Sequence, residues 1–303
     1  MHFEKVILED VEHLILKHDN IDLMALAPAH GARLTQLAFL ADNKPVNVLW
    51  EVSPEDCKTG AWSKNEILFP WPNRIEDGKY EYRGKTYQLP INEKANNNAL
   101  HGMITQASFE IVESEKTKEF ALVKLKYSYD GNNTYYPFAF DFWVTYSYGF
   151  KEGFQIQFDV TNTGNETLPF GLGWHPYLKL SDTLENVTLD IPQTDHLVLG
   201  ERNLPTGKES PFTHTSLEMS EWPLDDCFRL KQEGMFCTLK YGDLELKMSG
   251  SPEYRYLQLF TPEGFGTVAI EPMTSGVNVY NNKEGIRYLD ANESFQVFFK
   301  IEH

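Results

Sequence analysis

The stretch AFDFWVTYSYGF, residues 139–150, alternates apolar or aromatic side chains with largely polar ones at a period of two residues. One face would carry Phe140, Phe142, Val144, Tyr146 and Tyr148. After a turn at 151–153, FQIQFDVTNT at 154–163 repeats the alternation. Two such runs joined by a short turn predict a long β-hairpin with one buried face.

The same period recurs along most of the chain, and turn-forming residues separate the runs. They are VILED (6–10), HLILKH (13–18), IDLMALAP (21–28), FALVKLKYSY (120–129), CTLKYGDLELKMSG (237–250), RYLQLF (255–260), TVAIE (267–271) and SFQVFFKI (294–301). Helical periodicity is nearly absent, and only Thr215 to Glu221 offers a turn or two of helix. The sequence therefore predicts an all-β fold, a large antiparallel β-sandwich with very little helix.

The 303 residues are compatible with one large all-β domain. No Ser/Gly linker, low-complexity stretch or internal repeat divides the chain. We therefore expect a single domain over 1–303, with Pro54 to Gly102 as a loop-rich excursion.

The chain is acidic: 44 Asp and Glu residues against 27 Lys and Arg residues give a formal net charge of −17. Such a surface repels phosphate backbones and anionic lipids, so we expect no nucleic-acid or membrane partner. The three cysteines show neither disulfide nor zinc spacing, and no signal peptide or membrane span is evident. These features favour a cytoplasmic location.

A histidine interrupts the apolar run GLGWHPYLKL, residues 171–180. His175 stands between a tryptophan and a proline there. It can be a core histidine with satisfied ring nitrogens, or a functional group that a strand end delivers to a site. The choice depends on what other groups lie within reach.

Two further segments carry candidate groups. In 69–102, Arg74 follows Pro-Asn and His101 precedes a glycine, with a tight hairpin expected around Gly78 to Gly84. In TVAIEPMTSGVN, residues 267–278, Glu271 ends an apolar strand. A carboxylate there is either solvated at the strand exit or held for a purpose, because burial of an unpaired charge is costly.

Five short motifs, taken together and in order, resemble those of the aldose 1-epimerases, the mutarotases of the galactose mutarotase-like superfamily. They are PNRIEDGKY (72–80), ALHG (99–102), WHPYLKL (174–180), LDDCF (224–228) and IEPMT (270–274). The resemblance implies the family's supersandwich fold and interconversion of the α and β anomers of a free aldohexose. The context of His175 resembles the broad bacterial branch, so glucose and galactose stand unranked.

The resemblance also implies roles in catalysis. His175 matches the acid that protonates the ring oxygen, and Glu271 matches the base at the C1 hydroxyl. His101 matches a second histidine at the ring-oxygen side, and either imidazole is chemically able to carry the proton. Histidine titrates near neutral pH, and partial burial raises the pKa of a glutamate toward that range.

Other positions match groups that hold the sugar. Arg74 matches the arginine that binds vicinal hydroxyls with its fixed fork of donors. Asp225 matches a carboxylate that accepts hydrogen bonds from the sugar, with Asp226 as its rival. For an aromatic platform under the sugar, Trp174 is the nearest candidate and Trp71 another, and core packing is the alternative for both.

The expected partner is a small-molecule monosaccharide, bound by a monomer or a homodimer, with no metal and no cofactor. Three alternatives remain: a hexose-6-phosphate 1-epimerase, a non-catalytic sugar-binding protein, and a glycoside hydrolase. The first needs a basic cluster near the sugar's C6. The only local enrichment is Lys58, Lys64, Arg74, Lys79, Arg83 and Lys85. The last needs two carboxylates at a glycosidic bond and leaves the histidines unexplained.

Overall fold

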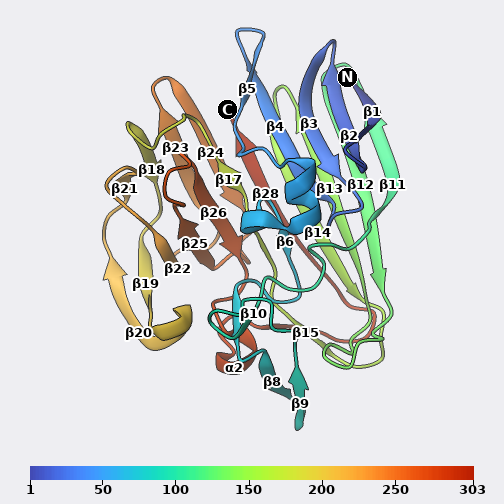
Figure 1. Cartoon of the computed structure of the whole chain (residues 1–303), viewed down its shortest axis with the longest axis vertical. Coiled ribbons are helices and arrows are strands. Elements are labelled where there is room, and N and C mark those ends of the chain that lie inside the picture. The colour runs from blue at the N-terminus through green and yellow to red at the C-terminus, as the bar shows by residue number, and fades with distance from the viewer.

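The computed structural model describes residues 1–303 as strands in three main antiparallel sheets (Figure 1). The largest has nine strands in the order β11-β12-β13-β14-β28-β24-β23-β18-β21. Its members are β11 (Glu110–Lys116), β12 (Phe120–Tyr129), β13 (Phe140–Gly149), β14 (Gly153–Asn162), β28 (Ser294–Glu302), β24 (Leu244–Gly250), β23 (Phe236–Tyr241), β18 (Val187–Asp190) and β21 (Ser216–Glu218). The β13–β14 hairpin is the one that the alternation at 139–163 predicts.

The second sheet has eight strands, ordered β20-β19-β22-β25-β26-β16-β6, with β17 paired to β26. Its members are β20 (Pro205–Phe212), β19 (Thr194–Leu199), β22 (Asp225–Leu230), β25 (Tyr256–Phe260), β26 (Val268–Met273), β16 (Gly173–Trp174), β17 (Tyr177–Leu178) and β6 (Ile67–Leu68). Its central strands β22, β25 and β26 carry the LDDCF, RYLQLF and IEPMT segments.

A five-stranded meander forms the third sheet, from β1 (His2–Leu8), β2 (Val11–His18), β3 (Ile21–Ala27), β4 (Arg33–Ala41) and β5 (Lys44–Asn47). Backbone bonds from Trp50 to Tyr177 and from Lys179 to Val48 join it to the eight-stranded sheet. In Figure 1 the blue strands β1–β4 lie over the green strands β11–β14, and β22, β25 and β26 lie on the other side of the molecule.

The remaining elements are short. Three strand pairs complete the sheets: β7 (Arg74–Glu76) with β10 (Asn98–Leu100), β8 (Lys79–Tyr82) with β9 (Lys85–Gln88), and β15 (Leu168–Phe170) with β27 (Arg287–Leu289). The helical segments are α1 (Pro54–Thr59), α2 (Val279–Asn282), η1 (Ala61–Ser63) and η2 (Glu201–Asn203). None of the helices is long and apolar enough to cross a membrane.

The structure corrects one expectation about secondary structure. Residues 215–221 form no helical turn, and Ser216–Glu218 instead pairs as β21 with β18. Leu217 and Met219 are buried and alternate with less buried neighbours, which is the period of a strand, and pairing with β18 decides the conformation of this short run.

One cluster of 65 buried residues forms the main core. It joins side chains of the meander, such as Leu16, to those of the nine-stranded sheet, such as Phe142 and Phe158. Two tyrosines of β13 fasten the layers, because the Tyr146 and Tyr148 hydroxyls donate to the backbone oxygens of Ala32 and Ala38. This packing makes a rigid base for the loops and strand ends that carry the candidate site.

Candidate active site

A pocket of about 220 Å³ lies where the eight-stranded sheet meets the 60–102 excursion. It is lined by Trp62, Ser63, Asn73, Arg74, Leu100, His101, His175, Tyr177, Asp225, Gln258, Phe260 and Glu271. Five of the six site residues expected from the sequence therefore meet in one place, although they come from segments that are far apart in the chain.

The centre of the pocket is a contact between an imidazole and a carboxylate. His175 Nε2 lies 3.4 Å from Glu271 Oε1, and both side chains are almost fully buried. The second polar atom of each, His175 Nδ1 and Glu271 Oε2, is buried without a hydrogen-bond partner in the protein. Buried polar atoms are nearly always satisfied, so unpaired ones in a pocket mark the place where a polar ligand or reactant belongs.

The backbone around His175 is fixed from both sides. Its amide donates to the Glu66 carbonyl, and its carbonyl accepts from the Asn65 amide. The Asn65 side chain accepts from the Tyr177 amide and donates to the Leu34 carbonyl, which ties this segment to the meander. His175 lies between β16 and β17, and Glu271 lies on the adjacent strand β26, so the sheet itself brings the pair together.

His101 enters the pocket from a turn rather than from a strand. Its backbone has a left-handed φ of 63°, and Gly102 follows with a φ of 83°. A Cβ at Gly102 would lie 2.2 Å from the Phe69 carbonyl oxygen, so the ALHG motif needs glycine at that position. The His101 ring packs edge-on against His175 with 5.2 Å between ring centroids, and its Nδ1 is buried without a partner.

Burial changes the proton affinity of all three catalytic candidates. Desolvation lowers the pKa of His175 to about 3, and it lowers the pKa of His101 well below its usual range. Desolvation, together with the charge of Asp225, raises the pKa of Glu271 well above the ordinary value, and the Arg74 guanidinium opposes this rise. These shifts place the proton shared by the pair on Glu271 rather than on His175.

Arg74 reaches the pocket from the start of β7, where a carboxylate from the excursion holds it. Its Nε and Nη2 donate to Glu93 at 3.0 to 3.1 Å, and two asparagines, Asn96 and Asn98, donate to the same carboxylate. The guanidinium is therefore oriented before any ligand arrives. No motif in the sequence pointed to Glu93.

A chain of amide contacts holds Asp225. Asn73 donates to Gln258 at 3.2 Å, and Gln258 donates to Asp225 at 3.0 Å. Asp226 instead contacts His196 at 2.7 Å and does not line the pocket. Of the two neighbouring aspartates, Asp225 is the one whose side chain is available to a ligand in the pocket.

The expectation that Trp174 forms an aromatic platform is wrong. Its ring is fully buried against Phe154 and Phe299, and its Nε1 donates to the Asn65 carbonyl. Trp71 also lies in the core, against Tyr136 and Tyr280.

The aromatic walls of the pocket are three side chains that the sequence analysis did not select: Trp62, Tyr177 and Phe260. Tyr177 stacks on His175 at 4.9 Å and 26°. A signal for Tyr177 was present, since alternate residues of an extended segment share a face and neighbours point apart. His175 and Tyr177 therefore face the pocket, and Trp174 faces the core.

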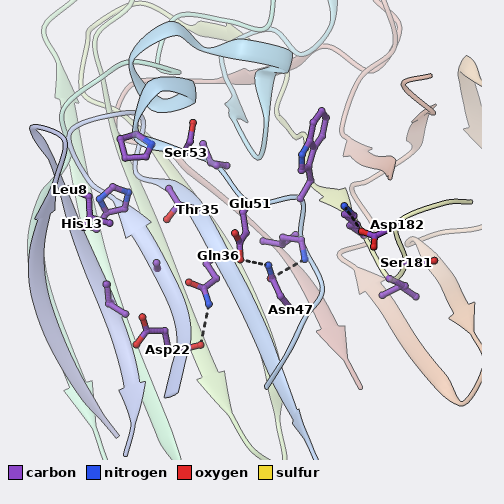
Figure 2. A pocket seen from close by; sticks show the side chains of 18 residues that line it. Leu8, His13, Asp22, Thr35, Gln36, Asn47, Glu51, Ser53, Ser181 and Asp182 are labelled. Atoms are coloured by element: carbon purple, nitrogen blue, oxygen red, sulfur yellow. Dashed lines mark hydrogen bonds and ion pairs between the residues drawn. The ribbon is translucent and has the colours of Figure 1, made fainter. Parts of the chain in front are cut away.

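A larger groove of about 800 Å³ lies between the meander and residues 179–182 (Figure 2). Figure 2 shows its polar lining, in which Asn47 bonds to Glu51 and Gln36 bonds to the Asp22 backbone. Its histidine, His13, bonds through Nδ1 to the Val11 carbonyl. No imidazole there contacts a carboxylate, so the smaller pocket is the better candidate for acid/base chemistry.

The fold is the β-sandwich of galactose mutarotase-like proteins. A galactose mutarotase-like protein from Clostridium acetobutylicum has a solved structure that superposes with a TM-score of 0.88, with 24% identity over 99% of this chain and 98% of that one. The family model for aldose 1-epimerase matches residues 13–302. The chain belongs to the aldose 1-epimerase family.

Two relatives in sequence are also informative. The chain is 27% identical over 280 residues to the uncharacterized protein YihR of Escherichia coli, across 89% of this chain and 87% of the relative. It is 26% identical over 151 residues to the galactose mutarotase of Mus musculus, across 48% of this chain and 42% of that protein.

Proposed function

We propose that the protein is an aldose 1-epimerase that interconverts the α and β anomers of a free aldohexose such as glucose or galactose. The observation that carries the proposal is the buried contact between His175 and Glu271. The second polar atom of each side chain, His175 Nδ1 and Glu271 Oε2, has no partner in the protein. Opening a pyranose needs a base at the C1 hydroxyl and an acid at the ring oxygen, held a short distance apart.

Ring opening starts from the form of the pair in which Glu271 is ionised and His175 carries the proton. Glu271 takes the proton of the C1 hydroxyl, the O–H electrons form the C1 carbonyl, and the bond from C1 to the ring oxygen breaks. His175 donates its proton to the departing ring oxygen. Hydrogen bonds from the sugar to the Glu271 carboxylate favour this ionised form over the neutral pair. Arg74 stabilises the carboxylate but also disfavours the protonated His175, so its charge does not by itself select the ionised form.

Ring closure reverses the proton transfers after rotation about the C1–C2 bond. The sugar hydroxyl returns its proton to His175 and attacks the other face of C1, while Glu271 returns its proton to the carbonyl oxygen. The pair needs one shared proton throughout, and no net proton is taken up or lost. The His101 ring packs against His175, which supports a role for His101 at the ring-oxygen side.

The surrounding groups serve the sugar's other hydroxyls. Arg74 has donors beyond those used by Glu93, and Asp225 offers acceptor oxygens at the exposed edge of the pocket. Trp62, Tyr177 and Phe260 supply apolar surface for the C–H face of the ring. Together these groups would hold C1 near the pair at the pocket floor.

The pocket lining favours a neutral sugar over a phosphorylated one. Of the basic residues considered for a 6-phosphate, Arg74 alone lines the pocket, and Glu93 neutralises its charge. A purely sugar-binding protein would use Arg74 and Asp225 but would gain nothing from a buried Glu271 whose Oε2 has no hydrogen-bond partner, because burial of an unsatisfied carboxyl oxygen is costly.

The test is polarimetry on freshly dissolved α-D-glucose and α-D-galactose, with wild type beside Glu271→Gln and His175→Asn. Acceleration by wild type that is largely lost in both variants supports the proposal and ranks the two sugars. Unaccelerated mutarotation of both sugars, with sugar binding intact by calorimetry, would favour the non-catalytic sugar-binding protein. If glucose 6-phosphate is then tested and it alone is accelerated, the hexose-6-phosphate 1-epimerase is favoured.

A further inference from the structure

Three arginines meet in a second cavity of about 540 Å³ that plays no part in the proposed reaction. Arg229 comes from β22, Arg255 immediately precedes β25, and Arg287 begins β27. Such a gathering of positive charge is unexpected in a chain with a net charge of −17, in which carboxylates outnumber cationic side chains 44 to 27.

Two of the three guanidinium groups lack a carboxylate partner. Arg255 makes no hydrogen bond or ion pair through its side chain, and its Nε is buried without an acceptor. Arg287 has a buried, unpaired Nε, a 3.4 Å bond to the Glu253 carbonyl, and a position over the Phe295 ring at 4.9 Å. Arg229, in contrast, is paired with Glu209.

The neighbouring acidic groups do not relieve this charge. Asp195 lies 3.9 Å from Arg229, beside the partner Glu209. Glu253 and Glu284 also lie nearby, and neither comes within 4 Å of a guanidinium. Burial lowers the pKa of Arg287, Glu253 opposes that shift, and the positive charge of Arg255 adds to it. Arg255 and Arg287 are half-buried, with their Nε atoms fully buried. Like charges held together in this way without counter-charges are unfavourable, and an anion bound between them would stabilise them.

The cavity is separate from the candidate active site, although both lie along the same strands. Asp225 and Arg229 are four residues apart on β22, which places their Cα atoms about 13 Å apart. A small apolar cluster fills the space between the sites: Leu197, Cys227, Tyr256, Met273 and Val277. A hexose phosphate with C1 at Glu271 has only a short exocyclic arm and would not reach the arginines.

The remaining walls are apolar and suit an organic ligand. Phe170, Ile286, Leu289 and Phe295 line the cavity beside the arginines. Gly285 permits the close approach of this wall, since a Cβ there would lie 2.7 Å from the Thr274 carbonyl oxygen, and its φ is 77°.

We propose that this cavity binds the phosphoryl group of an organic phosphate monoester, with Arg255 and Arg287 as the ligand-binding residues. The planar guanidinium can donate two parallel hydrogen bonds to two phosphoryl oxygens. The two guanidinium groups without a carboxylate partner together balance the charge of a phosphate dianion. The organic part of the ligand packs against the apolar wall. The inference does not depend on the proposed function, because the site shares no lining residue with the catalytic pocket.

Isothermal titration of the full chain tests the site with three probes at constant ionic strength: inorganic phosphate, phenyl phosphate and benzoate. We expect inorganic phosphate to bind with a Kd of about 1 mM and phenyl phosphate to bind about tenfold more tightly, since its ring also buries apolar surface. Benzoate carries the same ring and a single charge, so its binding should be at least tenfold weaker than that of phenyl phosphate, by order of magnitude.

Arg255→Gln and Arg287→Gln should each raise the Kd for phenyl phosphate about tenfold or more. Arg83→Gln is the matched control, because Arg83 is an exposed arginine outside the cavity that bonds to Thr167 and lies over the Tyr82 ring. Glu271→Gln should bind phenyl phosphate as wild type does, whatever its effect on mutarotation. Arg255→Lys keeps the positive charge but loses the planar guanidinium, and it should bind phenyl phosphate with intermediate affinity. This variant keeps the test decisive if a glutamine variant does not fold.

Three results would overturn the proposal: no heat of binding with either phosphate, a Kd that is the same in wild type and both arginine variants, or benzoate binding as tightly as phenyl phosphate. A loss of phosphate binding in Glu271→Gln would also count against it, because it would place the anion in the catalytic pocket.

Discussion

His175 Nε2 and Glu271 Oε1 lie 3.4 Å apart in the pocket, and the second polar atom of each side chain, Nδ1 and Oε2, is buried without a partner. The two residues lie on neighbouring strands of one sheet, so their separation is set by sheet geometry rather than by a flexible loop. Such an arrangement is pre-organised for proton exchange with a reactant that bridges the pair.

Removal of either member of this pair should abolish most of the activity. Glu271→Gln and His175→Asn should each lower kcat for mutarotation by about 10² to 10⁴, the usual contribution of general acid/base catalysis. Polarimetry at neutral pH measures this effect. His196→Asn is a matched control, because His196 also contacts a carboxylate but lies outside the pocket. An equal loss in the control would indicate a general structural effect.

The pH dependence should follow the shared proton. Burial lowers the pKa of His175 to about 3. On the acid side, uptake of a second proton by the pair disables it, so kcat/KM should fall only well below pH 6.5, the ordinary pKa of histidine. Burial raises the pKa of Glu271, so the alkaline limb, where the shared proton is lost, should lie well above 4.5. Rates corrected for uncatalysed mutarotation give the profile. An acid limb centred near 6.5 would show that His175 titrates like a solvated histidine.

The buried Glu271 should lower the stability of the fold as the pH rises. Below pH 4.5, the ordinary pKa of a glutamate, Glu271 is protonated in both the folded and the unfolded state. Above 4.5 the unfolded state ionises first, so Glu271 destabilises the fold as the pH rises toward its raised pKa. Glu271→Gln should therefore unfold at a higher temperature than wild type at pH 7, by about 2–4 °C or roughly 1 kcal/mol, and the gain should vanish near pH 4. Thermal denaturation at the two pH values decides this, and a gain of equal size at both would exclude ionisation as its cause.

Asp225 and Asp226 should differ in their effect on sugar binding. Asp225→Asn should raise KM about tenfold with a smaller change in kcat, because the side chain lies at the pocket edge and does not contact the reacting pair. Asp226→Asn is the matched control, since it changes the same charge one residue away and affects only the contact with His196. A larger rise in KM for the Asp226 variant would reverse the assignment.

Much of the fold was predictable because burial alternates with the strand period. The 139–163 hairpin and the strands through 256–260 and 268–273 follow directly from this alternation. Residues 215–221 do not form the expected helical turns, because the two buried residues Leu217 and Met219 follow the strand period and the segment pairs with β18. The hairpin at 79–88 was recognisable from its glycines.

The site was only partly predictable, for a different physical reason. Motifs identify the groups that do chemistry, but the groups that orient them come from elsewhere in the chain. Glu93 holds Arg74, and Asn65 holds the backbone of His175, and neither lies in a recognisable pattern. Trp174 is next to His175 in sequence, but neighbouring residues of an extended segment point to opposite faces, so the aromatic wall is formed by Tyr177 and not by Trp174.

Trp62 and Trp174 offer the clearest contrast between a residue that serves the site and one that serves the core. Trp62 lines the pocket, is 48% exposed, and has a left-handed backbone with φ of 58° and ψ of 9°, a conformation that bulky residues rarely adopt. Strain of this kind persists mainly where function requires it, so Trp62 is the better candidate for a sugar platform.

Trp62→Ala should therefore raise KM about tenfold and leave the free energy of unfolding within roughly 1 kcal/mol of wild type, since the exposed ring buries little surface. Trp174→Ala should lower the free energy of unfolding by about 3–5 kcal/mol, because it leaves a cavity beside Phe154 and Phe299 and an unpaired Asn65 carbonyl. Denaturant titration and polarimetry on the same samples separate the two effects. If Trp62→Ala proved the destabilised variant and left KM unchanged, the indole would be a structural element of the rim rather than part of the sugar site.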